Sequence, residues 1–151
     1  MKKITSLNQL KKLFYALIGF FLLILSIIFI SPVGDIFKGT LFFLAPFIIF
    51  SLLGLALLIL TLKSKVAGRL RKFLILTGAS ATGIFIGIFL HNFIYGLFAT
   101  FYGLDFWERI GLRDEPFFFF FALIICPIGF LIGALGSILL FARRKKTWDN
   151  F

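Results

Sequence analysis

The chain has 151 residues, of which 61% are hydrophobic and 15% are charged, and its formal net charge is +10. A soluble domain is typically about 45–50% apolar and about 25% charged, so this composition excludes an ordinary soluble domain and indicates an integral membrane protein. The basic residues lie in short segments between apolar runs rather than in a basic domain, which argues against nucleic-acid binding.

Four apolar runs follow one another along the chain, and none of them contains Asp, Glu, Lys or Arg. Each is close to or longer than the roughly 20 residues that a helix needs to cross about 30 Å of hydrocarbon. None alternates like a barrel strand, so the spans must be helices, whose backbone groups pair internally. The sequence therefore predicts an all-α, polytopic integral membrane protein, a four-helix bundle of two helical hairpins in a single domain. The predicted spans are residues 13–31, 41–62, 73–98 and 117–142.

The basic residues also predict the direction of the spans. Residues 1–12, 63–72 and 143–151 hold 13 Lys and Arg residues, whereas the connecting segments 32–40 and 99–116 hold three basic residues and five of the six acids. By the positive-inside rule the first three segments are cytoplasmic and the other two are outer loops, so both termini are cytoplasmic. We expect the protein in a prokaryotic plasma membrane.

The first run could also be a cleaved signal peptide, because it follows a basic start. Its apolar part, however, is longer than the usual length of about 7–15 residues, and it ends in FISPVGD without an A-x-A-like site. An uncleaved anchor is the better interpretation.

Proline and acidic residues mark features of the second hairpin. In the second outer loop, the segment LDFWERIGL (residues 104–112) is a candidate for a short interfacial helix. The sequence Asp114-Glu115-Pro116 should open the fourth helix, because acids favour the positive end of the helix dipole and proline is tolerated in the first turn. Pro127 lies within the fourth span and has no N–H for the usual helical hydrogen bond, so we expect a kink there.

Small residues recur on the third and fourth spans at spacings that suit close helix packing. In the third span Ala79, Gly83 and Gly87 are four residues apart. In the fourth span the spacings are 4, 3, 4 and 3, which keeps one face turned to a neighbouring helix. Lipid tails are as apolar as leucine, so close approach drives association and glycine allows it. We predict that the third and fourth helices form the tightest pair; the alternative is that these glycines face lipid by chance. The fourth-span residues are Ala122, Cys126, Gly129, Gly133 and Gly136.

A polar pair, His91-Asn92, interrupts the apolar sequence FLHNFIYGLF. Steps of four from Gly87 lead to His91 and then Tyr95, so His91 should point toward protein. It lies about 27 Å from the inner end of its span, near the outer boundary of the hydrocarbon. Two interpretations remain: a packed group with Asn92 and Tyr95 as hydrogen-bond partners, or a proton-responsive or ligand-binding group at the outer mouth of the bundle.

Carboxylates of the second outer loop could join this candidate polar site. Glu108, Asp114 and Glu115 could fold over His91 and form a metal or acid–base cluster, although their spacing does not require it. The sequence has a single histidine and a single cysteine, and it lacks HExxH, P-loop and GxSxG motifs. We therefore predict no catalytic residues, no metal site and no cofactor.

Three functions are compatible with these features. The first is a small non-enzymatic multi-pass membrane protein, a self-associating or accessory subunit packed through the glycine seams of the third and fourth helices. The second is a transporter or channel component with a polar site at His91 and Asn92, and the third is an outer-leaflet enzyme that acts on a lipid or quinone. The expected partners are anionic headgroups at the cytoplasmic face and a second copy or a larger membrane protein, but not nucleic acid.

The predicted topology can be tested with reporter fusions. Alkaline phosphatase fused after Lys146 should be inactive, because the enzyme works only outside the cytoplasm, whereas the same reporter fused after Ile110 should be active. Phosphatase activity from the fusion after Lys146 would overturn the predicted orientation.

Overall fold

The computed structural model describes residues 2–30 and 45–148, and every regular element within these ranges is helical. The predicted outer loop 32–40, the last residue of the first predicted span and the first four residues of the second lie outside the described residues. The elements are α1 (Lys2–Phe29), α3 (Ala45–Lys63), α4 (Arg69–Tyr102), α5 (Phe106–Arg109), α6 (Pro116–Phe120), a π-helical turn (Phe121–Ile125) and α7 (Cys126–Trp148).

Four helices are long and apolar enough to cross a membrane, which confirms the predicted all-α, four-helix membrane architecture. In α1 the apolar part is Leu7–Phe29, and α6, the π-helical turn and α7 together form a fourth span, Pro116–Arg143. The third span is the longest, because α4 has 34 residues. At the helical rise this is about 51 Å, compared with about 30 Å of hydrocarbon. The short helix α5 lies within the segment that the sequence singled out as an interfacial helix.

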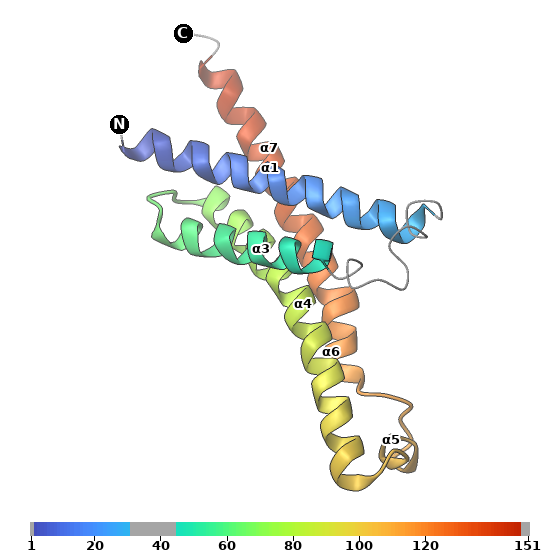
Figure 1. The fold of residues 1–151 in the computed structure, drawn as a ribbon. Coiled ribbons are helices and arrows are strands. Elements are labelled where there is room, and N and C mark those ends of the chain that lie inside the picture. The colour runs from blue at the N-terminus through green and yellow to red at the C-terminus, as the bar shows by residue number, and fades with distance from the viewer. Residues whose placement is uncertain (1, 31–44, 149–151) are drawn as a thin grey trace.

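The central helix of the fold is α4, which packs against α3 and against the fourth span, while α1 packs along α3. Figure 1 shows α1 and α3 side by side and crossed by the pair of α4 and α7, whose lower part extends away from the first hairpin and carries α5. The start of α1, the α3–α4 turn and the last turns of α7 lie toward the other side. We call these two sides the α5 end and the basic end.

Aromatic side chains from three helices form the core between the hairpins. The ring of buried Phe130 on α7 lies 4.6 Å from that of Phe21 on α1 and 5.2 Å from that of Phe50 on α3, measured between centroids. Nearer the basic end, buried Phe14 of α1 lies 5.6 Å from Phe141 of α7. Such ring pairs contribute about 0.5–1.5 kcal/mol each beyond burial. They join α1 to α7, the two helices farthest apart in the sequence.

Glycines in the left-handed region bound α4 at both ends. Gly68, before its first residue, has φ of 71°, and Gly103, after its last residue, has φ of 96°. Residues with side chains rarely adopt such values. The helix therefore begins and ends at fixed points of the sequence.

The contact between α3 and α4 depends on glycine. A Cβ added to Gly54 would lie 2.7 Å from the Cβ of Ala81, and one added to Gly78 would lie 2.8 Å from the Gly54 carbonyl oxygen. Real Cβ atoms essentially never approach other atoms so closely, so only glycine fits at either position. This contact is as extensive as that between α4 and α7 alone, but less extensive than that between α4 and the whole fourth span, which includes α6 and the π-helical turn. The third and fourth spans thus form the most extensive pair, as the sequence predicts, and α3 is a second close neighbour of α4 that the sequence does not predict.

The small residues of the third and fourth spans face one another. A Cβ added to Gly83 would lie 2.7 Å from the Cys126 Sγ, and one added to Gly87 would lie 2.8 Å from the Cβ of Ala122. Nearer the basic end, a Cβ at Gly133 would lie 2.7 Å from the backbone nitrogen of Thr77, so that backbone meets backbone. The remaining contacts join Gly129 to Ser80 and Gly136 to the ring of Phe73.

Ala79, which the sequence places in this seam, is exposed and lies outside it. A step of four residues advances 400° around a helix of 3.6 residues per turn, so each step drifts by about 40°. The series Gly87, Gly83, Ala79 therefore leaves the contact face. Ser80 occupies the next position in the seam, against Gly129 of the fourth span.

The fourth span is irregular where the sequence predicts a kink at Pro127. Residues Phe121–Ile125 form a π-helical turn, and the Cys126 N–H donates to the Phe121 carbonyl, five residues earlier. Pro127 has no N–H to donate to the Leu123 carbonyl. The irregularity therefore takes the form of one wide turn directly before the proline.

A matched pair of glycine substitutions tests the seam. We expect Gly133→Ala to lower the free energy of unfolding by about 1–3 kcal/mol, because the new methyl group would meet the backbone of Thr77 and overpack the contact. Gly19→Ala makes the same chemical change on α1 with nothing within 4 Å, so it should leave stability unchanged or slightly raised. Thermal unfolding in mild detergent gives the comparison. Equal effects of the two substitutions would contradict the seam.

Candidate functional site

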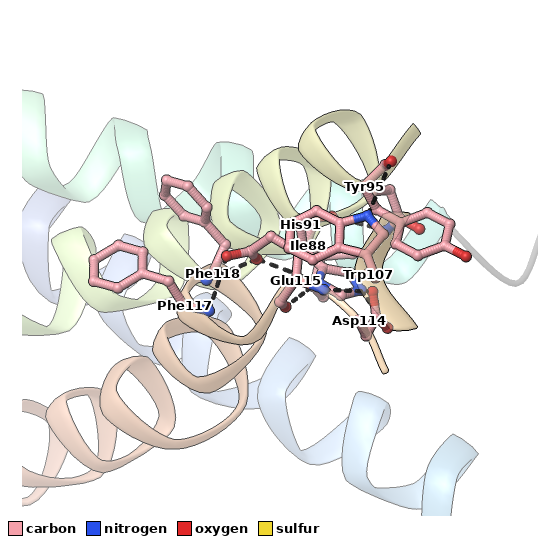
Figure 2. Close-up of polar contacts among 9 residues, drawn as sticks. Ile88, His91, Tyr95, Trp107, Asp114, Glu115, Phe117 and Phe118 are labelled. Carbon is pink, nitrogen blue, oxygen red and sulfur yellow. Dashed lines mark hydrogen bonds and ion pairs between the residues drawn. The ribbon is translucent and has the colours of Figure 1, made fainter. Parts of the chain in front are cut away.

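The fourth span begins with a carboxylate cap, drawn in Figure 2. The Oε1 of Glu115 accepts a hydrogen bond from the Phe117 N–H at 2.8 Å, and its Oε2 accepts one from the Phe118 N–H at 2.9 Å. The first N–H groups of a helix have no partner within the helix, and a side-chain oxygen at this position satisfies them. Pro116, the first residue of α6, has no N–H to satisfy. The local sequence thus places an acid at the start of α6.

His91 of α4 lies against this cap. Its Nδ1 is 2.9 Å from the Glu115 carbonyl oxygen and 3.4 Å from the Glu115 Oε2, and its Nε2 is 3.4 Å from the Asp114 Oδ2. The side chains of His91 and Glu115 are only 14% and 7% exposed, whereas that of Asp114 is 50% exposed. We call these three residues the clasp, because they join the α5 end of α4 to the start of the fourth span.

The acceptors of the clasp determine how the imidazole bonds. A carbonyl oxygen only accepts, so Nδ1 must carry a proton to bond the Glu115 backbone. An ionised carboxylate also only accepts, so Nε2 must carry a proton to donate to the Asp114 carboxylate. The contacts of the two ring nitrogens are therefore satisfied together when both carry a proton. In that state one hydrogen bond and two ion pairs hold the ring. The Asp114 Oδ1 also accepts from the Glu115 N–H at 2.7 Å, which fixes the turn.

The expected partners of His91 have other contacts. Asn92 is exposed, and its Nδ2 donates to the Ile88 carbonyl of the same helix at 2.8 Å. Tyr95 stacks on Trp107 of α5, with ring centroids 6.1 Å apart. The expectation that Asn92 and Tyr95 are the hydrogen-bond partners of His91 is therefore replaced by the contacts with Asp114 and Glu115.

Of the three loop carboxylates considered from the sequence, two join the clasp. Glu108 lies on α5 and is exposed. Asp114 and Glu115 directly precede Pro116, and a carboxylate next to a predicted helix start was the signal that could have selected them. Both lie more than 20 residues from His91 along the chain. Helical spacing relates only residues of the same helix, so it could not predict this pairing.

A shallow groove of about 250 Å³ opens beside the clasp. One edge is polar, with His91 and Asn92, and the rest is apolar. The ring of Phe119 packs 5.4 Å from the imidazole and closes one side. Such a groove would suit part of an apolar molecule rather than a hydrated ion. The lining residues are Ile88, His91, Asn92, Phe119, Ala122 and Leu123.

Within residues 2–30 and 45–148, no three His, Cys, Asp or Glu side chains are grouped so that they could hold a metal ion. The only cysteine, Cys126, is buried in the helix seam opposite Gly83. The expectation that the protein has no catalytic residue and no cofactor remains a prediction.

Comparison of the chain with protein-family models, with curated proteins and with solved structures found no match. The fold and the clasp define a small membrane protein with four helical spans. A role beyond this has to come from the chemistry and placement of its own residues.

Two glutamates of the same loop test the clasp. Glu115→Ala should lower the free energy of unfolding by about 1–3 kcal/mol, because it removes the helix cap and a partner of His91. Glu108→Ala removes an equal charge from an exposed position and should change stability by less than about 0.5 kcal/mol. Thermal unfolding in detergent measures both. If Glu108→Ala is as costly as Glu115→Ala, the clasp does not hold the hairpin together.

Proposed function

We propose that this protein is a small non-enzymatic multi-pass membrane protein, an accessory or self-associating subunit that contacts its partner through the α5 end of α4. The proposal is supported chiefly by an apolar surface on the part of α4 that continues past the clasp. The predicted topology makes this end the outer one.

The clasp indicates where the hydrocarbon ends on this side. Ionised carboxylates are costly in hydrocarbon, so Asp114 and Glu115 belong at the level of the headgroups. His91 belongs at the same level, because it contacts both. From His91, α4 continues for three more turns to Tyr102, or about 16 Å. The last turns of α4 therefore belong at or beyond the headgroups.

These turns carry large exposed apolar side chains where a water-facing helix would carry polar ones. Phe101 is 74% exposed, and Leu104 in the following turn is 82% exposed. A groove of about 460 Å³ lies between side chains of the same turns. Exposed apolar patches of this kind mark contact surfaces, and aromatic side chains are enriched in them. We call this surface the apolar knob; its exposed members are Phe93, Leu97, Phe101, Tyr102 and Leu104.

Three polar side chains of α4 bond within the fold, which favours a non-enzymatic subunit over a transporter. The imidazole of His91 is engaged in the clasp on both sides. The hydroxyls of Thr77 and Thr82 donate to carbonyls one turn earlier in α4. A transport path needs polar groups that face a passage, whereas these three side chains of α4 bond within the fold.

One observation favours the alternative of an outer-leaflet enzyme that acts on a lipid or quinone. The groove beside His91 is mostly apolar and has the imidazole at its edge. For general acid–base chemistry, His91 would have to exchange a contact with Asp114 or Glu115 for one with the substrate. The present contacts therefore favour the structural role.

Site-specific photo-crosslinking in cells tests the proposal. A photoreactive phenylalanine analogue in place of Phe101 should form a protein adduct, because the apolar knob contacts a partner. The matched control is the same analogue in place of Leu135, which is 61% exposed on α7 within the fourth span and should meet lipid. An adduct of twice the mass identifies a second copy, and a heavier one identifies a different membrane protein.

A second variant makes the outcome decisive. Phe101→Glu should abolish an adduct formed from an analogue at Leu97, because a charge would break the apolar contact. Adducts absent from both knob positions, or equally strong at Leu135, would contradict the proposal. The apolar knob would then be part of the belt of aromatic side chains that membrane proteins place at headgroup level, and it would have no protein partner.

A further inference from the structure

A third groove, of about 510 Å³, lies at the basic end on the surface of α1. Its lining residues occur at positions i, i+3, i+4 and i+7, which places them on one face of the helix. The neighbouring face of α1 is buried in the core through Leu10, Phe14 and Leu17. Burial of that face holds the groove in a fixed orientation. The lining residues are Asn8, Lys11, Lys12 and Tyr15.

Aromatic rings position one of the two lysines. The Lys11 Nζ lies 5.9 Å from the centroid of the Phe141 ring on α7. The Tyr15 ring lies 6.4 Å from the same ring. A cation over an aromatic face gains about 0.5–1 kcal/mol at an exposed site. The ammonium group of Lys11 is thus held near the groove, while Lys12 is exposed beside it.

The positive charge of this groove has no acidic partner among the described residues. The acids in the described ranges are Asp105, Glu108, Asp114 and Glu115. All four lie in the segment that contains α5 and the start of α6, at the opposite end of the fold. Two ammonium groups, an amide and a phenol hydroxyl are therefore available to an anion with several acceptor oxygens.

The surface next to the groove is apolar and carries small side chains. Ala16 and Gly19 follow Lys12 at steps of four and three along the same face of α1, and both are exposed. A Cβ built on Gly19 would have nothing within 4 Å, so this surface is open. The polar groove thus continues into an uncovered apolar strip directed along the span. A polar, basic groove followed by an apolar strip fits a molecule with an anionic head and an apolar tail.

We propose that this groove binds the headgroup phosphate of an anionic phospholipid. Lys11 and Lys12 supply the charge, Asn8 and Tyr15 supply hydrogen-bond donors, and one acyl chain lies along Ala16 and Gly19. Basic side chains beside a span attract anionic lipids, and the aromatic rings suit the headgroup level. The apolar strip favours a lipid over an acidic protein segment, which would need only the charges. The site is independent of the apolar knob at the other end.

The test uses native mass spectrometry of the full chain purified in mild detergent, with phosphatidylglycerol or phosphatidylcholine added. Lys11→Gln with Lys12→Gln should weaken phosphatidylglycerol binding by about thirtyfold, since each basic group near an anionic surface contributes about fivefold. The matched control, Lys63→Gln with Lys65→Gln, removes the same charge from exposed positions near the α3–α4 turn at the same end. It should weaken binding less than threefold.

A second variant and a second probe separate a lipid site from a site for a free anion. Gly19→Leu keeps every charge and its Cβ would have no atom of the fold within 4 Å, yet it should weaken phosphatidylglycerol binding at least threefold because it blocks the strip. Glycerol phosphate without acyl chains should compete poorly. Equal losses from the two lysine pairs, or equal binding of phosphatidylcholine, would overturn the proposal. Full competition by glycerol phosphate would show a site for a free phosphate anion instead.

Discussion

The fold depends on how closely the backbone of α4 can approach a helix on each of two sides. In a bilayer, apolar side chains gain little by leaving lipid for one another, so the attraction between helices comes from dense contact. Glycine supplies that density: Gly54 and Gly78 bring α3 against α4, and Gly83 and Gly133 do the same between α4 and the fourth span. With side chains at these positions the helices would stand apart, and lipid could fill the gap.

The position of the clasp follows from that packing. The seam pairs residues of α4 with residues of the fourth span in antiparallel order, from Gly133 beside Thr77 to Ala122 beside Gly87. One turn past Gly87, the seam brings His91 to the first residues of α6. The clasp thus lies at the end of the glycine contact between α4 and the fourth span. Charge pairing in the clasp and glycine packing in the seam favour the same register of the two helices.

The sequence predicts the local features of this fold well and the distant pairings poorly. The four apolar spans are visible because each is a property of consecutive residues. The fourth-span seam is visible because alternating steps of four and three stay on one face. Ala79 was placed wrongly because steps of four drift around the helix. The contact of Gly54 with Gly78 and that of His91 with Glu115 are long-range, and no periodicity within one helix encodes which helix lies opposite.

The glycines at the two ends of α4 have a mechanical consequence. Between Gly68 and Gly103 the helix is a single uninterrupted rod longer than the hydrocarbon is thick. The middle of α4 packs on two sides against α3 and the fourth span, at distances that leave no room for a side chain at the contacting glycines. A displacement of the aromatic tip of α4 would therefore strain its glycine contacts with α3 and with the fourth span, and so load both neighbouring helices.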